Sequence, residues 1–133
     1  MSGSVAHVNS RSQRTTVDRS KRFYDAVLEP LGYKCLRAAR ALLGFGYGTD
    51  SIALWIVQVE RPVPADEKSG LHICFTAPNS AAVDASHAAA LRAGGHDNGA
   101  PGLRPVYGPD YYVAFIVDPD GYRIEAYYGP GET

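Results

Sequence analysis

The feature that most constrains the fold of this chain is a repeated order of predicted elements. Each half reads as one strand, one helix and about three further strands, and the polar segment ERPVPADEKSG separates the halves. Both helices open with similar residues, VDRS from Val17 and VDAS from Val83. Neither half could bury its sheet alone, so the halves should pack together. The sequence therefore predicts an α+β fold, in which two βαβββ modules form a curved mixed sheet, an open barrel, around a cavity.

The two modules should make up one domain over residues 1–133. Module one spans about 1–59, the linker about 60–70 and module two about 71–133. A chain of 133 residues with a hydrophobic fraction of 45% is an ordinary single globular domain.

Charge and cysteine content narrow the class of protein. A net charge of −1 gives no basis for a nucleic-acid partner. The sequence shows neither a secretory leader nor an apolar run of membrane-spanning length, so we expect no membrane partner. Cys35 and Cys74, far apart in the sequence, are expected to be reduced thiols of a cytoplasmic protein.

Local signals predict the elements of the first half. A strand is expected near Val5–Arg11, followed by a helix that Thr15 caps and Gly32 ends in the left-handed conformation. Three strands should follow, at 33–38, 42–47 and 51–59.

The second half repeats this order of secondary-structure elements. A strand at Leu71–Thr76 should precede a helix that Asn79 or Ser80 caps and that runs to about Ala93. The segment HDNGAPGLRPVYGPD is rich in glycine and proline, which predicts a long loop that could act as a lid over a substrate. Strands at 111–117 and 122–128 should flank a DPDG turn.

The alternation of apolar and polar residues along two predicted strands indicates a pair of candidate site residues. In LHICFT, Ile73 and Phe75 belong to an apolar face suited to packing on helices, so His72 should point to the opposite face. In YRIEAYY, Ile124 lies on the apolar face and Glu125 on the other. In a curved sheet, the face that carries His72 and Glu125 would line the cavity.

Two histidines and one carboxylate form the facial ligand set of Fe(II), which also suits Zn, Mn or Ni. The first strand, which contains His7, would have to supply the second imidazole beside His72 and Glu125. The alternative interpretation is that each is an ordinary hydrogen-bonded or solvated side chain, as a lone strand histidine usually is.

Three segments, RSKRFYDAVLEPLGYK, LHICF and DPDGYRIEAYY, resemble the vicinal-oxygen-chelate superfamily, which includes glyoxalase I, extradiol dioxygenases and the fosfomycin- and bleomycin-resistance proteins. The resemblance spans about Thr16 to Tyr128. It implies paired βαβββ modules, a frequent homodimer and a divalent metal ion, with ligands from the first strand of each module and from the last strand.

Carried over by motif, the resemblance implies that His72 and Glu125 are metal ligands and that Glu125 is a catalytic carboxylate. An ungapped count back from FYD places Asn9 nearest the third ligand position, and His7 matches with about two residues inserted. Glyoxalase I itself is disfavoured, because Ala53 stands where its fourth ligand, a glutamate, would be.

The resemblance implies two kinds of function. The first is a metalloenzyme with lyase, isomerase or dioxygenase chemistry on a small oxygenated metabolite. The second is a metal-free protein that binds a drug or metabolite, like the bleomycin-resistance relatives.

Five residues are candidates for binding the substrate. Arg104 could clamp a carboxylate or phosphate, or it could be a solvated surface group. The tyrosines could stack on the substrate or donate to it, or they could only pack the loop. Trp55 could form a cavity wall or belong to the core. The full set is Arg104, Tyr107, Tyr111, Tyr112 and Trp55.

Overall fold

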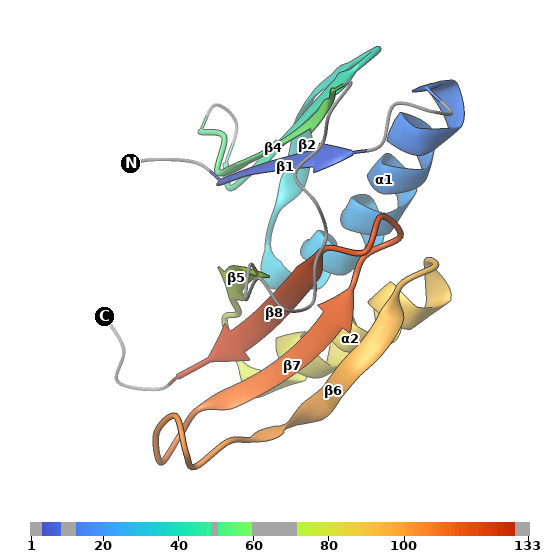
Figure 1. Ribbon diagram of the computed structural model, residues 1–133. Helices are drawn as coiled ribbons and strands as arrows, with labels where there is room; N and C mark the ends of the chain where they lie inside the picture. The colour runs from blue at the N-terminus through green and yellow to red at the C-terminus, as the bar shows by residue number, and fades with distance from the viewer. Residues whose placement is uncertain (1–3, 9–12, 49–50, 60–71, 130–133) are drawn as a thin grey trace.

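A computed structural model describes residues 4–8, 13–48, 51–59 and 72–129, with the backbone alone for residues 4–8 and 13–16. Two four-stranded sheets carry one long helix each (Figure 1). The expected order of two βαβββ modules is confirmed.

Module one contains β1 (Ser4–Val8), α1 (Gln13–Leu28), the 3-10 turn η1 (Glu29–Leu31), β2 (Lys34–Ala39), β3 (Leu42–Gly46) and β4 (Leu54–Gln58). Its sheet has the order β1-β4-β3-β2, in which β1 runs parallel to β4 and the other pairs are antiparallel. Gly32 follows η1 with φ of +93°, so it takes the left-handed conformation that the sequence predicts.

Module two contains β5 (His72–Thr76), α2 (Ser80–Arg92), β6 (His96–Leu103), β7 (Tyr112–Val117) and β8 (Arg123–Tyr128). Its sheet repeats the same pattern, with the order β5-β8-β7-β6 and β5 parallel to β8. Asn79 caps α2, because its side chain accepts a 2.8 Å hydrogen bond from the Ala82 N–H.

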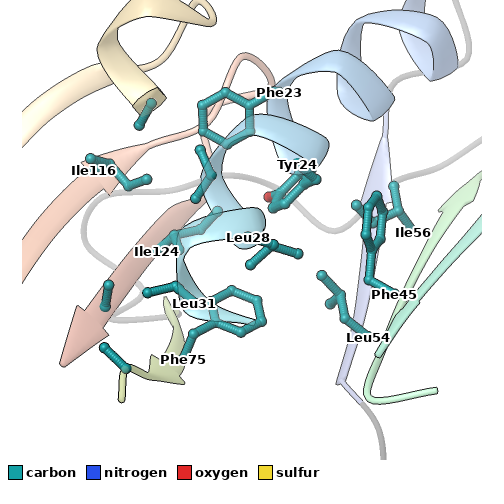
Figure 2. Close-up of a cluster of buried hydrophobic side chains, with 14 of the residues drawn as sticks. Phe23, Tyr24, Leu28, Leu31, Phe45, Leu54, Ile56, Phe75, Ile116 and Ile124 are labelled. Atoms are coloured by element: carbon teal, nitrogen blue, oxygen red, sulfur yellow. The ribbon is translucent and has the colours of Figure 1, made fainter. Parts of the chain in front are cut away.

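The core lies around α1, which contributes to both modules (Figure 2). One side of α1 packs toward Phe45, Leu54 and Ile56 of the first sheet, and the other faces Ile116 and Ile124 of the second. The buried residues of α1 recur at helical spacing: Val17, Phe23, Tyr24, Val27 and Leu28. This shared core fixes one module against the other, as neither sheet face could be buried alone.

Polar contacts reinforce the junction between the modules. The Ser86 hydroxyl of α2 donates a buried 2.8 Å hydrogen bond to the carbonyl of Val27 in α1. At the other end of α1, Arg19 forms a 2.7 Å ion pair with Asp120, in the turn between β7 and β8.

The two sheets do not close into a barrel: among the described strands, no ladder joins one sheet to the other. A groove of about 700 Å³ lies between the helices and is lined by residues of α1, η1 and α2. This groove belongs to the helical layer and is therefore not the cavity expected beside His72 and Glu125. No helix within the described ranges is long and apolar enough to span a membrane.

Two local expectations are wrong. Thr15 is not an N-cap, because α1 already begins at Gln13. The segment expected as a structureless lid is mostly strand β6, whose pairing with β7 shifts register between Asp97 and Gly99 and again before Gly102. An edge strand interrupted in this way accommodates the glycines and Pro101 that suggested a loop. The linker at 60–70 lies outside the described residues.

Candidate metal site

Strands β5 and β8 place the candidate site. They run parallel and in register, so that Cys74 lies opposite Glu125 and His72 lies opposite Arg123. Alternate residues share a face, and Phe75 is buried in the core. His72 and Cys74 therefore lie on the face turned away from that core, and both are exposed.

His72 and Glu125 approach each other directly. The distance from Nε2 of His72 to Oε1 of Glu125 is 3.3 Å, and the pair becomes an ion pair when His72 is protonated. The His72 side chain is 52% exposed, whereas that of Glu125 is only 7% exposed. A buried carboxylate thus sits beneath an imidazole that opens to solvent. A cation could therefore reach the Glu125 carboxylate from the solvent on the side of the His72 imidazole.

Tyr111 contacts the second oxygen of the same carboxylate. Its hydroxyl donates a 3.1 Å hydrogen bond to Oε2 of Glu125, and its ring stacks on that of Tyr127 at a centroid distance of 4.7 Å. Burial and the nearby Glu125 charge raise the pKa of Tyr111 well above its usual value. The phenol therefore stays protonated and remains a donor.

Cys74 is a member of this group that the sequence analysis did not place among the site residues. Partial burial of its sulfur, together with the neighbouring Glu125 carboxylate, raises the pKa of Cys74 to about 12, although the residue as a whole is exposed. The thiol is therefore protonated near neutral pH. The sequence offered one indication of this: Cys74 follows His72 by two positions, and residues two apart on a strand share a face.

The donor set suits a divalent metal ion. Imidazole nitrogen and carboxylate oxygen together favour Fe, Mn, Ni or Zn. A spacing of 3.3 Å is compatible with two bonds of about 2.0–2.2 Å to one cation. Within the described residues, no group of three or more His, Cys, Asp or Glu side chains is arranged to hold a metal. Two donors, His72 and Glu125, are thus what the described side chains supply.

The third predicted ligand, His7, is placed only by its backbone. It lies in β1 opposite Val57 of β4, while its side chain lies outside the described part of the structure. Asn9, the other position considered for that ligand, is also outside the described residues.

The substrate-binding candidates are not gathered in one place. Arg104 donates to the carbonyls of Ala100, at 2.7 Å, and Leu103, at 3.4 Å. Its guanidinium lies 5.7 Å from the ring centroid of Phe115. Tyr112 donates a 2.6 Å hydrogen bond to Asp84 of α2. The side chains of Arg104 and Tyr112 thus form hydrogen bonds within module two.

Tyr107 and Trp55 complete the set. Tyr107 is exposed, and its ring centroid lies 5.4 Å from that of Tyr111. Trp55 lies in the other sheet and alternates with the buried Leu54 and Ile56, so it faces away from the core. It covers Gly44, where a Cβ would lie 2.9 Å from the indole ring. Of the five candidates, Tyr111 is the one in direct contact with Glu125.

The fold resembles known structures over nearly its whole length. A glyoxalase/bleomycin resistance protein from Albidiferax ferrireducens T118 is 29% identical, with a TM-score of 0.78, and the match covers 97% of this chain and 98% of that one. The fosfomycin resistance protein FosX from Mesorhizobium loti is 18% identical, with a TM-score of 0.66 and coverage of 98% and 92%.

A glyoxalase I mutant from Zea mays is 20% identical, with a TM-score of 0.64, over 96% of this chain and 46% of that one. At these lower identities the likeness concerns the fold. The comparison with curated proteins gave no match. The profile of the Glyoxalase/Bleomycin resistance protein/Dioxygenase superfamily matches residues 4–126. The chain therefore belongs to the glyoxalase, bleomycin resistance protein and dioxygenase superfamily.

Proposed function

We propose that this protein is a divalent-metal-dependent enzyme that acts on a small oxygenated metabolite by lyase, isomerase or dioxygenase chemistry. The observation that carries the proposal is the approach of His72 Nε2 to Glu125 Oε1 at 3.3 Å, on neighbouring strands of one sheet. Both residues occupy the positions that the superfamily resemblance implies for metal ligands.

The roles of the chain's own groups follow from their surroundings. His72 would supply a nitrogen ligand from an exposed position, and Glu125 would supply one negative charge from a buried position. His7 would be the third ligand, from β1. A bound divalent cation would supply Lewis-acid stabilisation of charge on neighbouring substrate oxygens, or with Fe(II) a site for dioxygen. With three protein ligands, coordination positions remain open for the substrate.

Metal analysis of tag-free protein tests the proposal. We expect about one metal ion per chain after incubation with Fe(II), Mn, Ni or Zn and desalting, and loss of that metal in His72→Ala and Glu125→Gln. His96→Ala is the matched control, because His96 is exposed on the edge strand β6 and should leave the metal content unchanged. Wild-type protein that stays metal-free with all four metals would refute the proposal.

His7 needs its own variant. His7→Ala should weaken metal binding about as strongly as His72→Ala does, because both would supply an imidazole ligand. Unchanged affinity would remove His7 from the ligand set and leave His72 and Glu125 in it.

A second candidate, a metal-free binding protein, is favoured by one observation. The rings of Tyr107, Tyr111 and Tyr127 form a continuous series with centroid distances of 5.4 and 4.7 Å. Such a series offers stacking surface to a planar ligand. Titration of chelator-treated protein with bleomycin, followed by tyrosine fluorescence, distinguishes the two functions: binding without metal favours this candidate, and no binding counts against it.

We further propose a homodimer, as is frequent in the superfamily. Sedimentation equilibrium should give twice the chain mass of 14.3 kDa, whereas a single-chain mass would contradict the dimer.

A further inference from the structure

Tyr111 has a specific relation to the candidate ligand Glu125. We infer that Tyr111 is a positioning residue, whose hydroxyl occupies one oxygen of Glu125 and leaves the other oxygen to bind a cation with His72. This inference rests on the proposed metal-dependent function and adds to it the group that sets how Glu125 coordinates.

The two oxygens of Glu125 have different neighbours. Oε2 accepts the 3.1 Å hydrogen bond from the Tyr111 hydroxyl, and Oε1 lies 3.3 Å from Nε2 of His72. The hydrogen bond from the phenol weakens Oε2 as a metal ligand, whereas Oε1 lies beside the imidazole that would share the cation. The arrangement thus favours coordination through Oε1 alone. Groups that hold a metal ligand from behind in this way orient it and tune its basicity.

The position of Tyr111 is itself fixed at both ends of the residue. Its backbone carbonyl accepts a 2.8 Å hydrogen bond from the Arg104 N–H, and its own N–H donates to the Gly108 carbonyl at 3.4 Å. Its ring stacks on Tyr127 with an interplanar angle of 18°. The hydroxyl is therefore held at Glu125 by the connection between β6 and β7. This role differs from the substrate contact that the sequence suggested for Tyr111.

The adjacent tyrosine, Tyr112, has a different hydrogen-bond partner. The hydroxyl of the adjacent Tyr112 donates to Asp84 of α2, on the helix side of the sheet. Tyr111 and Tyr112 thus each donate to a carboxylate, but only Tyr111 donates to the candidate ligand. Tyr112→Phe is consequently a matched control for Tyr111→Phe.

The test compares metal binding by these two variants. Tyr111→Phe keeps the stacked ring and removes the hydroxyl, so we expect Mn²⁺ and Co²⁺ to bind about 10- to 100-fold more weakly by calorimetry. The visible spectrum of the Co²⁺-loaded protein should also change, because Glu125 then lacks the group that fixes the orientation of its carboxylate at the metal. Tyr112→Phe should match the wild type in both measurements, whatever its effect on stability.

A metal-free measurement keeps the inference distinct from the proposed function. The unfolding equilibria of Tyr111→Phe, Glu125→Leu and the double variant form a cycle that reports the coupling between these two side chains, because leucine offers no acceptor to the Tyr111 hydroxyl. We expect the effects to be non-multiplicative. Multiplicative effects would overturn the inference, as would an unaltered Co²⁺ spectrum and affinity in Tyr111→Phe while His72→Ala abolishes binding. Wild-type protein that binds no metal would overturn the proposed function and this role together, even where the cycle shows the hydrogen bond.

Discussion

The hydroxyl of Tyr24 in α1 donates a 2.5 Å hydrogen bond to the carboxylate of Asp118, which lies 94 positions later in the chain. Asp118 is 2% exposed, and its other oxygen accepts from the N–H groups of Asp120 and Tyr122 at 2.9 and 2.8 Å. A single buried carboxylate thus organises the β7–β8 turn and ties it to the helix of the other module.

The burial of Asp118 predicts a pH-dependent stability. Burial raises the pKa of Asp118 to about 6 from its usual 3.8, so the folded chain keeps a proton that the unfolded chain releases. The free energy of unfolding should therefore fall as the pH rises between these two values, by on the order of 3 kcal/mol, and then level off. Asp118→Asn keeps an acceptor for the two N–H groups and should lose this part of the slope.

Urea denaturation of both proteins between about pH 4 and pH 7 checks this prediction. Other groups titrate in the same window, so the relevant quantity is the difference in slope between Asp118→Asn and the wild type. Parallel slopes would show that folding does not raise the pKa of Asp118, which would contradict the prediction.

Removing the Tyr24 hydroxyl should destabilise the protein. Tyr24→Phe leaves an oxygen of the buried Asp118 without its donor, which should lower the free energy of unfolding by about 1–3 kcal/mol. Tyr47→Phe is a control, because the Tyr47 hydroxyl donates to the Leu31 carbonyl from a residue that is 48% exposed. Chemical denaturation should show a clearly smaller loss for Tyr47→Phe, and equal losses would contradict a special role of the Tyr24 bond.

Close backbone approach at the end of β3 should make Gly46 intolerant of any side chain. A Cβ there would lie 1.8 Å from the carbonyl oxygen of Ser51, so Gly46→Ala must displace backbone and should cost about 3 kcal/mol or more. At Gly102 the nearest atom to a Cβ is the flexible end of Arg104, at 3.1 Å. Gly102→Ala should change stability by less than about 1 kcal/mol. Thermal unfolding of both variants checks this prediction. Equal melting temperatures would contradict the expected intolerance of Gly46 to a side chain.

The paired modules and the site strands could be predicted from sequence because their signals are local and periodic. Phe75 and Ile124 mark the core-facing side of their strands, and alternation then assigns His72 and Glu125 to the other side. Parallel pairing of β5 with β8 brings them together. Alternation assigned the two residues to a shared face, and the structure adds that their strands are direct neighbours.

Strand β6 could not be predicted in the same way. Its glycines and Pro101 are turn signals locally, and only pairing with β7 stabilises an extended conformation there. The pairing also decides what Arg104 contacts, since its guanidinium turns back onto the carbonyls of Ala100 and Leu103. The sequence alone left Arg104 either as a clamp for a carboxylate or phosphate or as a solvated surface group.

The contacts of Tyr111 and Cys74 with Glu125 likewise depend on tertiary structure. Tyr111 precedes Glu125 by 14 positions, and the β7–β8 hairpin decides whether the two meet. The closeness of the two sheets around α1 is a similar case, because side-chain packing between the modules determines it.

Crystals of the wild-type protein soaked in Mn²⁺ offer the most direct test of the metal site. Anomalous scattering should show one peak per chain within about 2.0–2.3 Å of both His72 Nε2 and Glu125 Oε1. The same map from Glu125→Gln crystals should lack that peak. A wild-type map with no peak at His72 and Glu125 would contradict the central claim, and so would a peak that persists unchanged in Glu125→Gln.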